Sequence, residues 1–306
     1  MLIPSPRATV DLFKAAFSEW NEDKASRLAA ALAYYAAISL APLLIILLGV
    51  AGLAFGPAAA AGQLKGQIQD LIGPQSAEVV QDIINNANMP AAGIVSSAVG
   101  IVILLLGASG VFGALQDGLN TVWEVAPKPG RGIIGILRDR FLSLTMVLGI
   151  GFLLLVSLVV SALLAALGTY MNGVLPLPWF LLNVINAVVS FVVVAVLFAL
   201  IYKVLPDAEI GWSDVFIGAT ITSLLFTIGK LLIGLYLGRS TLANAYGAAG
   251  SLVIILIWIY YSAQILFFGA ELTQVYANKF GSRIRPAGNA LAVEDNPSAQ
   301  EGRSTS

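Results

Sequence analysis

Two charged residues lie within long apolar stretches of the chain, where an ionised side chain is costly and therefore points to a function. Lys230 could bind an anionic head group, although its ammonium could instead extend along the helix to the membrane surface. Glu271 could relay protons, or it could pair with Lys24 or Arg27 at the inner surface. Because these two charges are expected at different depths, we do not predict a direct ion pair between them.

Other polar side chains gather near the ends of the same stretches and in the middle of the last one. Together with Lys230 and Glu271 they form a candidate substrate pathway: Asp117, Asn120, Arg239, Asn244, Tyr246, Tyr260, Tyr261 and Gln264. Tyrosines at span ends are often interfacial anchors, but Tyr260 and Tyr261 are expected near mid-span, where a hydroxyl needs a hydrogen-bond partner. Pro42 removes a backbone hydrogen bond within the first apolar stretch and predicts a helix kink there.

The chain contains no histidine and no cysteine. Histidine is the commonest general base in enzymes and a frequent metal ligand, and cysteine provides thiolate nucleophiles and zinc ligands. The sequence also lacks a recognisable serine–base pair and a pair of carboxylates placed for catalysis. We therefore predict that the protein is not an enzyme and that it uses no metal ion and no cofactor.

Six apolar stretches must position these side chains. They cover residues 32–55, 93–115, 141–167, 181–204, 214–237 and 249–271. Each approaches or exceeds the roughly 20 residues with which a helix crosses a bilayer. Hydrophobic residues form 58% of the chain and charged residues only 11%, too few charges for a surface that faces water. The predicted fold class is therefore all-α, a polytopic membrane helix bundle of about six transmembrane helices, and its 30 glycines favour close helix packing.

The distribution of Lys and Arg orients this bundle, because short cytoplasmic loops are enriched in both residues. Of the 16 such residues, 13 fall before the first stretch, in the loop 116–140, at the end of the fourth stretch, or in the tail. Lys65 and Arg239 fall on the other side. We therefore predict a multi-pass protein whose N- and C-termini both lie in the cytoplasm.

The segment of residues 1–31 precedes the predicted membrane domain of residues 32–277. It is amphipathic, with Phe13, Phe17 and Trp20 near one face of a predicted helix. Such a helix could lie in the membrane interface, or it could pack against the cytoplasmic side of the bundle.

Two further segments differ in composition from the apolar stretches. The outer loop 57–92 has the pattern of a helical hairpin, which could be a lid, a docking surface or a structural cap. The tail of residues 278–306 is rich in Ser, Gly, Pro, Asn and charge, and we predict that it is disordered.

Three blocks of the sequence resemble the signature blocks of the YihY/BrkB family: Arg27–Leu44, Gly107–Trp123 and Gly238–Ala277. The resemblance covers roughly residues 10–280. It implies a six-span bacterial inner-membrane protein, and it makes transport of a lipid or a lipopolysaccharide precursor a candidate activity. Some members were named ribonuclease BN, but such a nuclease needs a His/Asp metal cluster that a chain without histidine cannot build. We therefore expect neither ribonuclease activity nor a nucleic-acid partner.

Two functions remain open. The protein could be a transporter or flippase of a lipid or another amphiphilic or anionic substrate, with membrane lipids as its partners. Alternatively, it could be a structural or assembly protein of the membrane that transports nothing. A polar cavity that contains Lys230 or Glu271 and opens sideways to lipid would favour the transporter, whereas a solid core would count against it. The sequence leaves the substrate and the oligomeric state undetermined.

Overall fold

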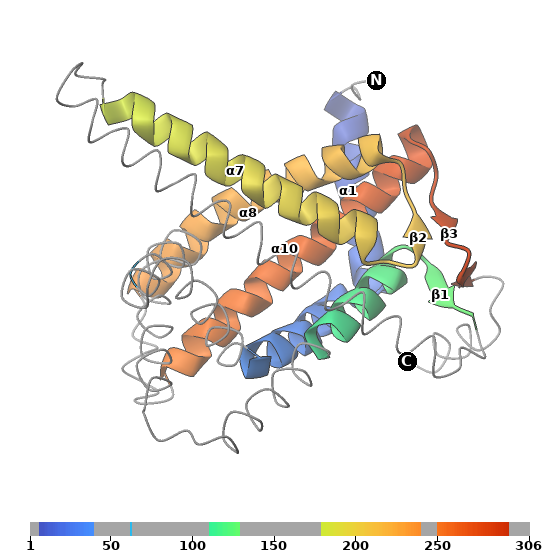
Figure 1. The fold of residues 1–306 in the computed structure, drawn as a ribbon, viewed down its shortest axis with the longest axis horizontal. Coiled ribbons are helices and arrows are strands. Elements are labelled where there is room, and N and C mark those ends of the chain that lie inside the picture. Colours follow the sequence, from blue (N-terminus) through green and yellow to red (C-terminus); the bar gives the residue numbers. More distant parts are fainter. Residues whose placement is uncertain (1–5, 40–61, 63–109, 129–178, 240–249, 294–306) are drawn as a thin grey trace.

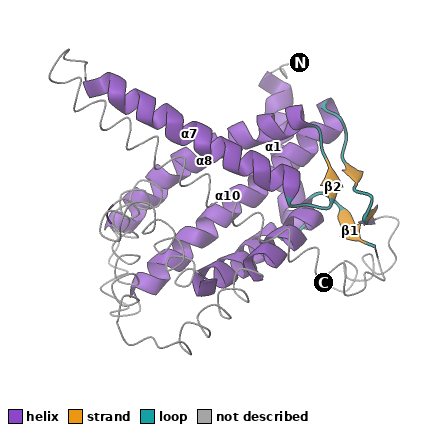
Figure 2. Ribbon diagram, viewed as in Figure 1, coloured by secondary structure: helices purple, strands orange, loops and turns teal. Residues whose placement is uncertain are grey.

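The structure is a computed structural model that describes residues 6–39, 62, 110–128, 179–239 and 250–293 of the 306-residue chain. This part is mostly helical, which confirms the predicted fold class (Figure 2). The helices with complete bounds are α1 (Pro6–Glu22), α7 (Trp179–Val204), α8 (Trp212–Arg239) and α10 (Gly250–Phe280). Further helical segments cover residues 25–39 and 110–122. Pro42, Asn244, Tyr246 and the hairpin predicted over 57–92 lie outside the described residues.

Within the described residues, three helices are long and apolar enough to cross a membrane. Their apolar segments are Ala187–Val204, Trp212–Tyr236 and Val253–Phe280. They coincide with the last three predicted stretches, so hydropathy located these spans correctly. Helix α10 continues nine residues beyond the predicted end at residue 271, because no glycine or proline interrupts the sequence before Gly281. The total of about six spans stays a prediction.

The amphipathic N-terminal segment is two helices rather than one. Helix α1 ends at Glu22, and Lys24 adopts a left-handed backbone conformation with φ of 53°, which redirects the chain into the helical segment 25–39. The two helices bury against different partners: Leu12 and Ala16 of α1 contact α10, whereas Ala25 and Ala29 join the main core. The predicted aromatic stripe is therefore only partly buried, and Phe17 is 56% exposed.

The tail is ordered as far as Val293, in contrast to the disorder predicted from residue 278. Strand β3 (Arg285–Pro286) pairs antiparallel with β2 (Ala208–Glu209), and β4 (Ala290–Ala292) pairs with β1 (Val125–Pro127). The four strands lie together at one end of the helices (Figure 2). Composition could not reveal this order, because the tail is held by backbone hydrogen bonds to two segments that are distant in sequence. It has no apolar side-chain pattern from which the strands could be predicted.

Helices α8 and α10 pack closely where a glycine of one helix faces a threonine of the other. A Cβ atom at Gly218 would collide with Thr273, and one at Gly269 would collide with Thr222. Each threonine hydroxyl donates to a carbonyl of its own helix, Thr222 to Gly218 at 2.7 Å and Thr273 to Gly269 at 2.6 Å. We call these four residues the α8–α10 seam. In this seam the glycines allow the two helix backbones to approach one another, and each buried threonine hydroxyl has a hydrogen-bond acceptor in its own helix.

Candidate functional site

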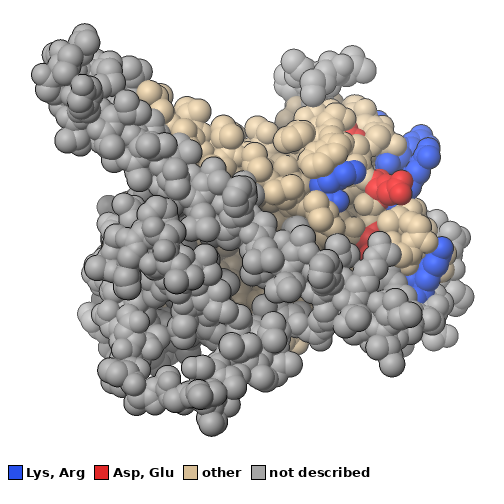
Figure 3. Space-filling view, in the orientation of Figure 1, with Lys and Arg blue, Asp and Glu red and all other residues tan. Residues whose placement is uncertain are grey.

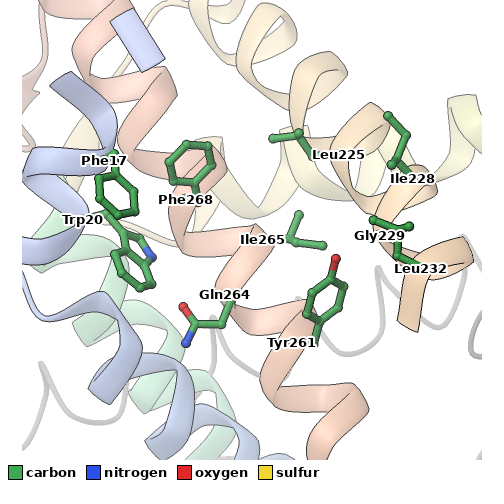
Figure 4. A pocket seen from close by; sticks show the side chains of 10 residues that line it. All are labelled: Phe17, Trp20, Leu225, Ile228, Gly229, Leu232, Tyr261, Gln264, Ile265 and Phe268. Carbon is green, nitrogen blue, oxygen red and sulfur yellow. The ribbon is translucent and has the colours of Figure 1, made fainter. Parts of the chain in front are cut away.

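A cavity of about 400 Å³ lies between α1, α8 and α10, and we call it the lateral groove. Helix α10 packs against both of the other helices and therefore forms its base (Figure 1). Its lining residues are mostly apolar (Figure 4): Phe17, Trp20, Leu225, Ile228, Gly229, Leu232, Tyr261, Gln264, Ile265 and Phe268. A site of this size and lining suits an acyl chain or another apolar ligand.

The rim of the lateral groove is formed by exposed apolar side chains. Ile228 is 47% exposed on α8, Leu232 is still more exposed, and Phe17 lies opposite them on α1. Gly229 brings α8 close to α10 at this level, because a Cβ atom there would lie 2.7 Å from both Ile265 Cδ1 and the Tyr261 hydroxyl. On the α8 side, this exposed apolar rim belongs to a helix that is long and apolar enough to cross a membrane.

Three polar groups interrupt the apolar lining. Tyr261 directs its hydroxyl into the cavity, and Gln264 and Trp20 approach one another where α10 meets α1 (Figure 4). Trp20 Nε1 and Gln264 Oε1 are buried and have no hydrogen-bond partner among the described residues. A buried polar atom without a partner is unfavourable by about 1–3 kcal/mol, and this donor and this acceptor are complementary to one another.

A second cavity of about 480 Å³ continues along α1. It is lined by Thr9, Val10, Phe13, Lys14, Phe17 and Phe268. Phe17 and Phe268 line both cavities, so the two are neighbours along one apolar path. Lys14 is exposed and places a positive charge beside this path, at the middle of α1.

The structure divides the predicted pathway residues between several environments. Tyr261 and Gln264 line the lateral groove, whereas Tyr260 is 38% exposed and does not line it. Glu271 is fully buried, and neither it nor Lys230 lines the groove. Among the described residues, the groove therefore does not provide the polar cavity around Lys230 or Glu271 that would favour a transporter.

The two charges do lie at different depths, as the sequence predicts. Gly229 contacts Tyr261, whereas Gly218 faces Thr273, which fixes the antiparallel register of α8 and α10. Lys230 is therefore level with Tyr261, ten residues before Glu271. At a rise of about 1.5 Å per residue, this corresponds to about 15 Å along the helix.

Asp117 and Asn120, the two pathway residues of the segment 110–122, do not line the groove. Asp117 is exposed, and Asn120 is buried in contact with Asp207. Arg239 is the last residue of α8. None of these three residues contributes to the lateral groove.

Asp207 is the centre of a hydrogen-bond network that the sequence did not reveal. Its carboxylate accepts bonds from Asn289 at 2.7 Å, Asn120 at 3.2 Å and Gln116 at 3.4 Å. Asn120 Oδ1 in turn accepts from the backbone N–H of Asp207 at 2.8 Å. We call these four residues the Asp207 network. It joins the segment 110–122, the end of α7 and the tail, which are far apart in sequence.

Asp214 ties the tail to the start of α8. Its carboxylate accepts from the backbone N–H of Ser282 at 2.8 Å and from the Ser282 hydroxyl at 2.7 Å. The backbone N–H of Gly211 donates to the same hydroxyl oxygen at 3.1 Å. As the acidic residue in the first turn of α8, Asp214 also interacts favourably with the helix dipole.

Charged side chains gather at the end of the structure that carries β2 and β3 (Figure 3). Lys203 lies at the end of α7, where its Nζ donates to the carbonyl of Ile210 and is 5.7 Å from the ring of Trp212. Trp212 is about half exposed and stacks on Phe216. An aromatic pair beside a lysine at the end of a span is typical of the interface between a membrane and water.

Apolar helices of spanning length, packed through glycine–threonine contacts, define an α-helical integral membrane protein. A family model described as Virulence factor BrkB matches residues 16–293, and the chain belongs to this family. It is 30% identical to a UPF0761 membrane protein of Halorhodospira halophila over 88% of this chain and 57% of that protein. A UPF0761 membrane protein of Mannheimia succiniciproducens is 26% identical over 86% of this chain and 88% of its own length. No solved structure matches the chain.

Proposed function

We propose that the protein moves a lipid or another amphiphile across the membrane along the lateral groove. The observation that carries this proposal is an apolar cavity with an exposed apolar rim and three polar groups inside it. A soluble substrate would need a water-filled polar pathway, whereas an amphiphile needs an apolar wall for its chain and a few polar contacts for its head. The name "membrane protein" given to the relatives agrees with this proposal but does not specify it.

We also propose that the end bearing the Asp207 network faces the cytoplasm of a bacterial inner membrane. Its support is the gathering of Lys and Arg at that end. Because the chain has no cysteine, a single Glu209→Cys variant provides a specific label site on exposed β2. A membrane-impermeant maleimide is expected to label it only after the cells are permeabilised. Labelling in intact spheroplasts would show the opposite orientation, and Lys65→Cys, expected outside, serves as the control.

Narrowing the rim of the lateral groove is expected to slow lipid movement. Ile228→Trp adds an indole at an exposed position, so it should obstruct a passing chain without disturbing the helix core. An obstruction worth about 1–3 kcal/mol corresponds to a rate about fivefold to 150-fold lower. The rate is measured in proteoliposomes, as the rate at which a fluorescent phospholipid of the inner leaflet becomes accessible to a membrane-impermeant quencher added outside.

The matched control is Leu231→Trp, three residues along α8. Leu231 is 62% exposed and does not line the groove, so this variant should transport at the wild-type rate. Equal slowing in both variants would point to a general effect of an added indole and would contradict the groove as the path. No transport by the wild-type protein would instead favour the structural or assembly role.

A further inference from the structure

We propose that the second cavity beside α1 is a binding site for one anionic phospholipid. The phosphate of this lipid is bound by Arg7 and Lys14. Its acyl chain lies in the cavity along Phe13, Phe17 and Phe268. The inference goes beyond the proposed function, because the site holds a lipid on the protein whether or not any lipid moves along the lateral groove.

One exposed stripe of α1 alternates cations with apolar side chains. Arg7, Val10, Lys14 and Phe17 follow one another at spacings of three or four residues, which places them on one face of the helix. All four side chains are exposed, and Val10 and Phe17 are each more than half exposed. The opposite face of α1 packs against α10. An exposed face that combines apolar and basic side chains is typical of a helix that binds an anionic membrane surface.

The charges on α1 favour an anion at this stripe. Lys14 lines the cavity, and Arg7 precedes it by two turns on the same face. Arg7 lies in the first turn, which contains no acidic residue and bears the positive end of the helix dipole. Asp11 is one turn from both cations, but it lies across the helix from Phe13 and does not line the cavity. A phosphate at the edge of the cavity would therefore meet two cations.

The end of α10 reaches the layer of lipid head groups. Its apolar segment Val253–Phe280 has 28 residues, about 42 Å at the rise of a helix, whereas the hydrocarbon of a bilayer is about 30 Å thick. Lys279 and Arg283 are exposed at the end of this segment, and basic side chains belong among head groups and not in hydrocarbon. The last turns of α10 therefore lie in the head-group layer.

Helix α1 begins beside these last turns and runs antiparallel to α10 (Figure 1). Near the start of α1, Leu12 packs in one cluster with Tyr276, and further along, Trp20 lines the lateral groove together with Tyr261. Arg7 is therefore the part of the stripe closest to the head groups, and a lysine two turns deeper extends its ammonium toward the same layer. The cations thus mark the head-group end of the stripe, and the cavity continues from them toward the hydrocarbon.

The rest of the second cavity suits an acyl chain. Its volume is about 480 Å³, and apart from Thr9 and Lys14 it is lined by Val10 and three phenylalanines. The rings of Phe13 and Phe268 pack with their centroids 6.2 Å apart where α1 meets α10. A soluble phosphate would contact the cations alone, whereas a phospholipid also fills the apolar part of the cavity.

A direct binding measurement tests the site separately from transport. The full-length protein in detergent is titrated with dioleoyl-phosphatidylglycerol and, in parallel, with dioleoyl-phosphatidylcholine, which has the same chains and no net charge. Native mass spectrometry resolves each bound lipid. We expect phosphatidylglycerol to bind about 25-fold more tightly, which is about fivefold for each of the two cations. Equal affinity for the two lipids would overturn the inference.

A soluble anion separates a lipid site from a phosphate site. Glycerol 3-phosphate carries the anionic group without the chains, and it should not displace phosphatidylglycerol when the two are present at equal concentration. Displacement under these conditions would assign the cations to a soluble phosphate and would reject the lipid as the occupant.

Two variants assign the preference to its residues. Arg7→Gln and Lys14→Gln each remove one charge at an exposed position, and each is expected to weaken phosphatidylglycerol binding about fivefold while phosphatidylcholine binding stays unchanged. The matched control is Arg27→Gln, at an exposed position that does not line the cavity, and it should keep the wild-type affinity. An equal loss in Arg27→Gln would show a general attraction to basic residues and would contradict a defined site.

The remaining outcomes separate this site from the lateral groove. Unchanged affinity in both Arg7→Gln and Lys14→Gln would overturn the assignment, and if one variant fails to fold, the other decides. Ile228→Trp should slow lipid movement and leave phosphatidylglycerol binding unchanged, whereas weaker binding would place the lipid in the groove instead. If the preference is found but no lipid crosses the membrane of proteoliposomes, the transport proposal fails and the binding site stands. If lipids cross but the two lipids bind equally well, transport stands and the binding site fails.

Discussion

Replacing Gly218 by alanine is expected to separate α8 from α10 and to lower the free energy of unfolding by about 3 kcal/mol. The added methyl group would overlap the Thr273 side chain, whose Cβ and Cγ2 atoms would lie 2.7 Å away. Thr273 cannot turn aside freely, because its hydroxyl is bonded to the Gly269 carbonyl. In a membrane, helix association depends largely on such close packing, so the loss is not easily compensated. Thermal unfolding of the purified protein in detergent measures the effect.

Gly234→Ala on the same helix is the matched control for Gly218→Ala. Nothing lies within 4 Å of a Cβ atom built at Gly234. Its alanine variant should therefore be as stable as the wild type or slightly more stable, since alanine favours a helix by about 1 kcal/mol over glycine. The double variant Gly218→Ala, Thr273→Gly should recover part of the lost stability. If Gly218→Ala unfolds at the same temperature as Gly234→Ala, this result contradicts the close packing of Gly218 against Thr273 in the α8–α10 seam.

Replacing Asp207 by alanine is expected to release the tail and to destabilise the protein by about 3–5 kcal/mol. The variant would leave the buried amides of Asn120 and Asn289 without their acceptor. Hydrogen bonds to a charged acceptor contribute about 1.5–3 kcal/mol each, and two strong ones are lost here. Asp207→Asn should cost nearly as much, because a neutral amide replaces one of the accepting oxygens by a donor.

The loss of the Asp207 network has a local readout as well as a global one. Limited proteolysis should cut the segment 281–293 faster in Asp207→Ala and in Asn289→Ala than in the wild type, because strands β3 and β4 detach. Glu209→Ala is the control, since Glu209 is exposed two residues away. Unchanged cleavage and an unchanged unfolding temperature in Asp207→Ala would show that the network does not hold the tail.

The sequence by itself determined the class of the protein and the positions of the last three spans. An apolar run of sufficient length forms a helix in lipid whatever its neighbours are, because the backbone must satisfy its hydrogen bonds internally. For the same reason, Lys230 and Glu271 could be assigned to different depths from their positions along their helices. The break at Lys24 was not predicted, because the apolar pattern continues on both sides of it and only the different packing partners of the two helices require a turn.

Only the tertiary structure decided which polar residues meet. Tyr260 and Tyr261 are equivalent by type and nearly so by position, yet the register of α10 against α8 and α1 places Tyr261, and not Tyr260, in the lining of the lateral groove. Asp207 looks like an ordinary loop residue until Asn120 and Asn289, 87 and 82 residues away, are folded against it. Local sequence determines a helix because its hydrogen bonds are local, whereas a site built from distant side chains exists only once their helices are packed.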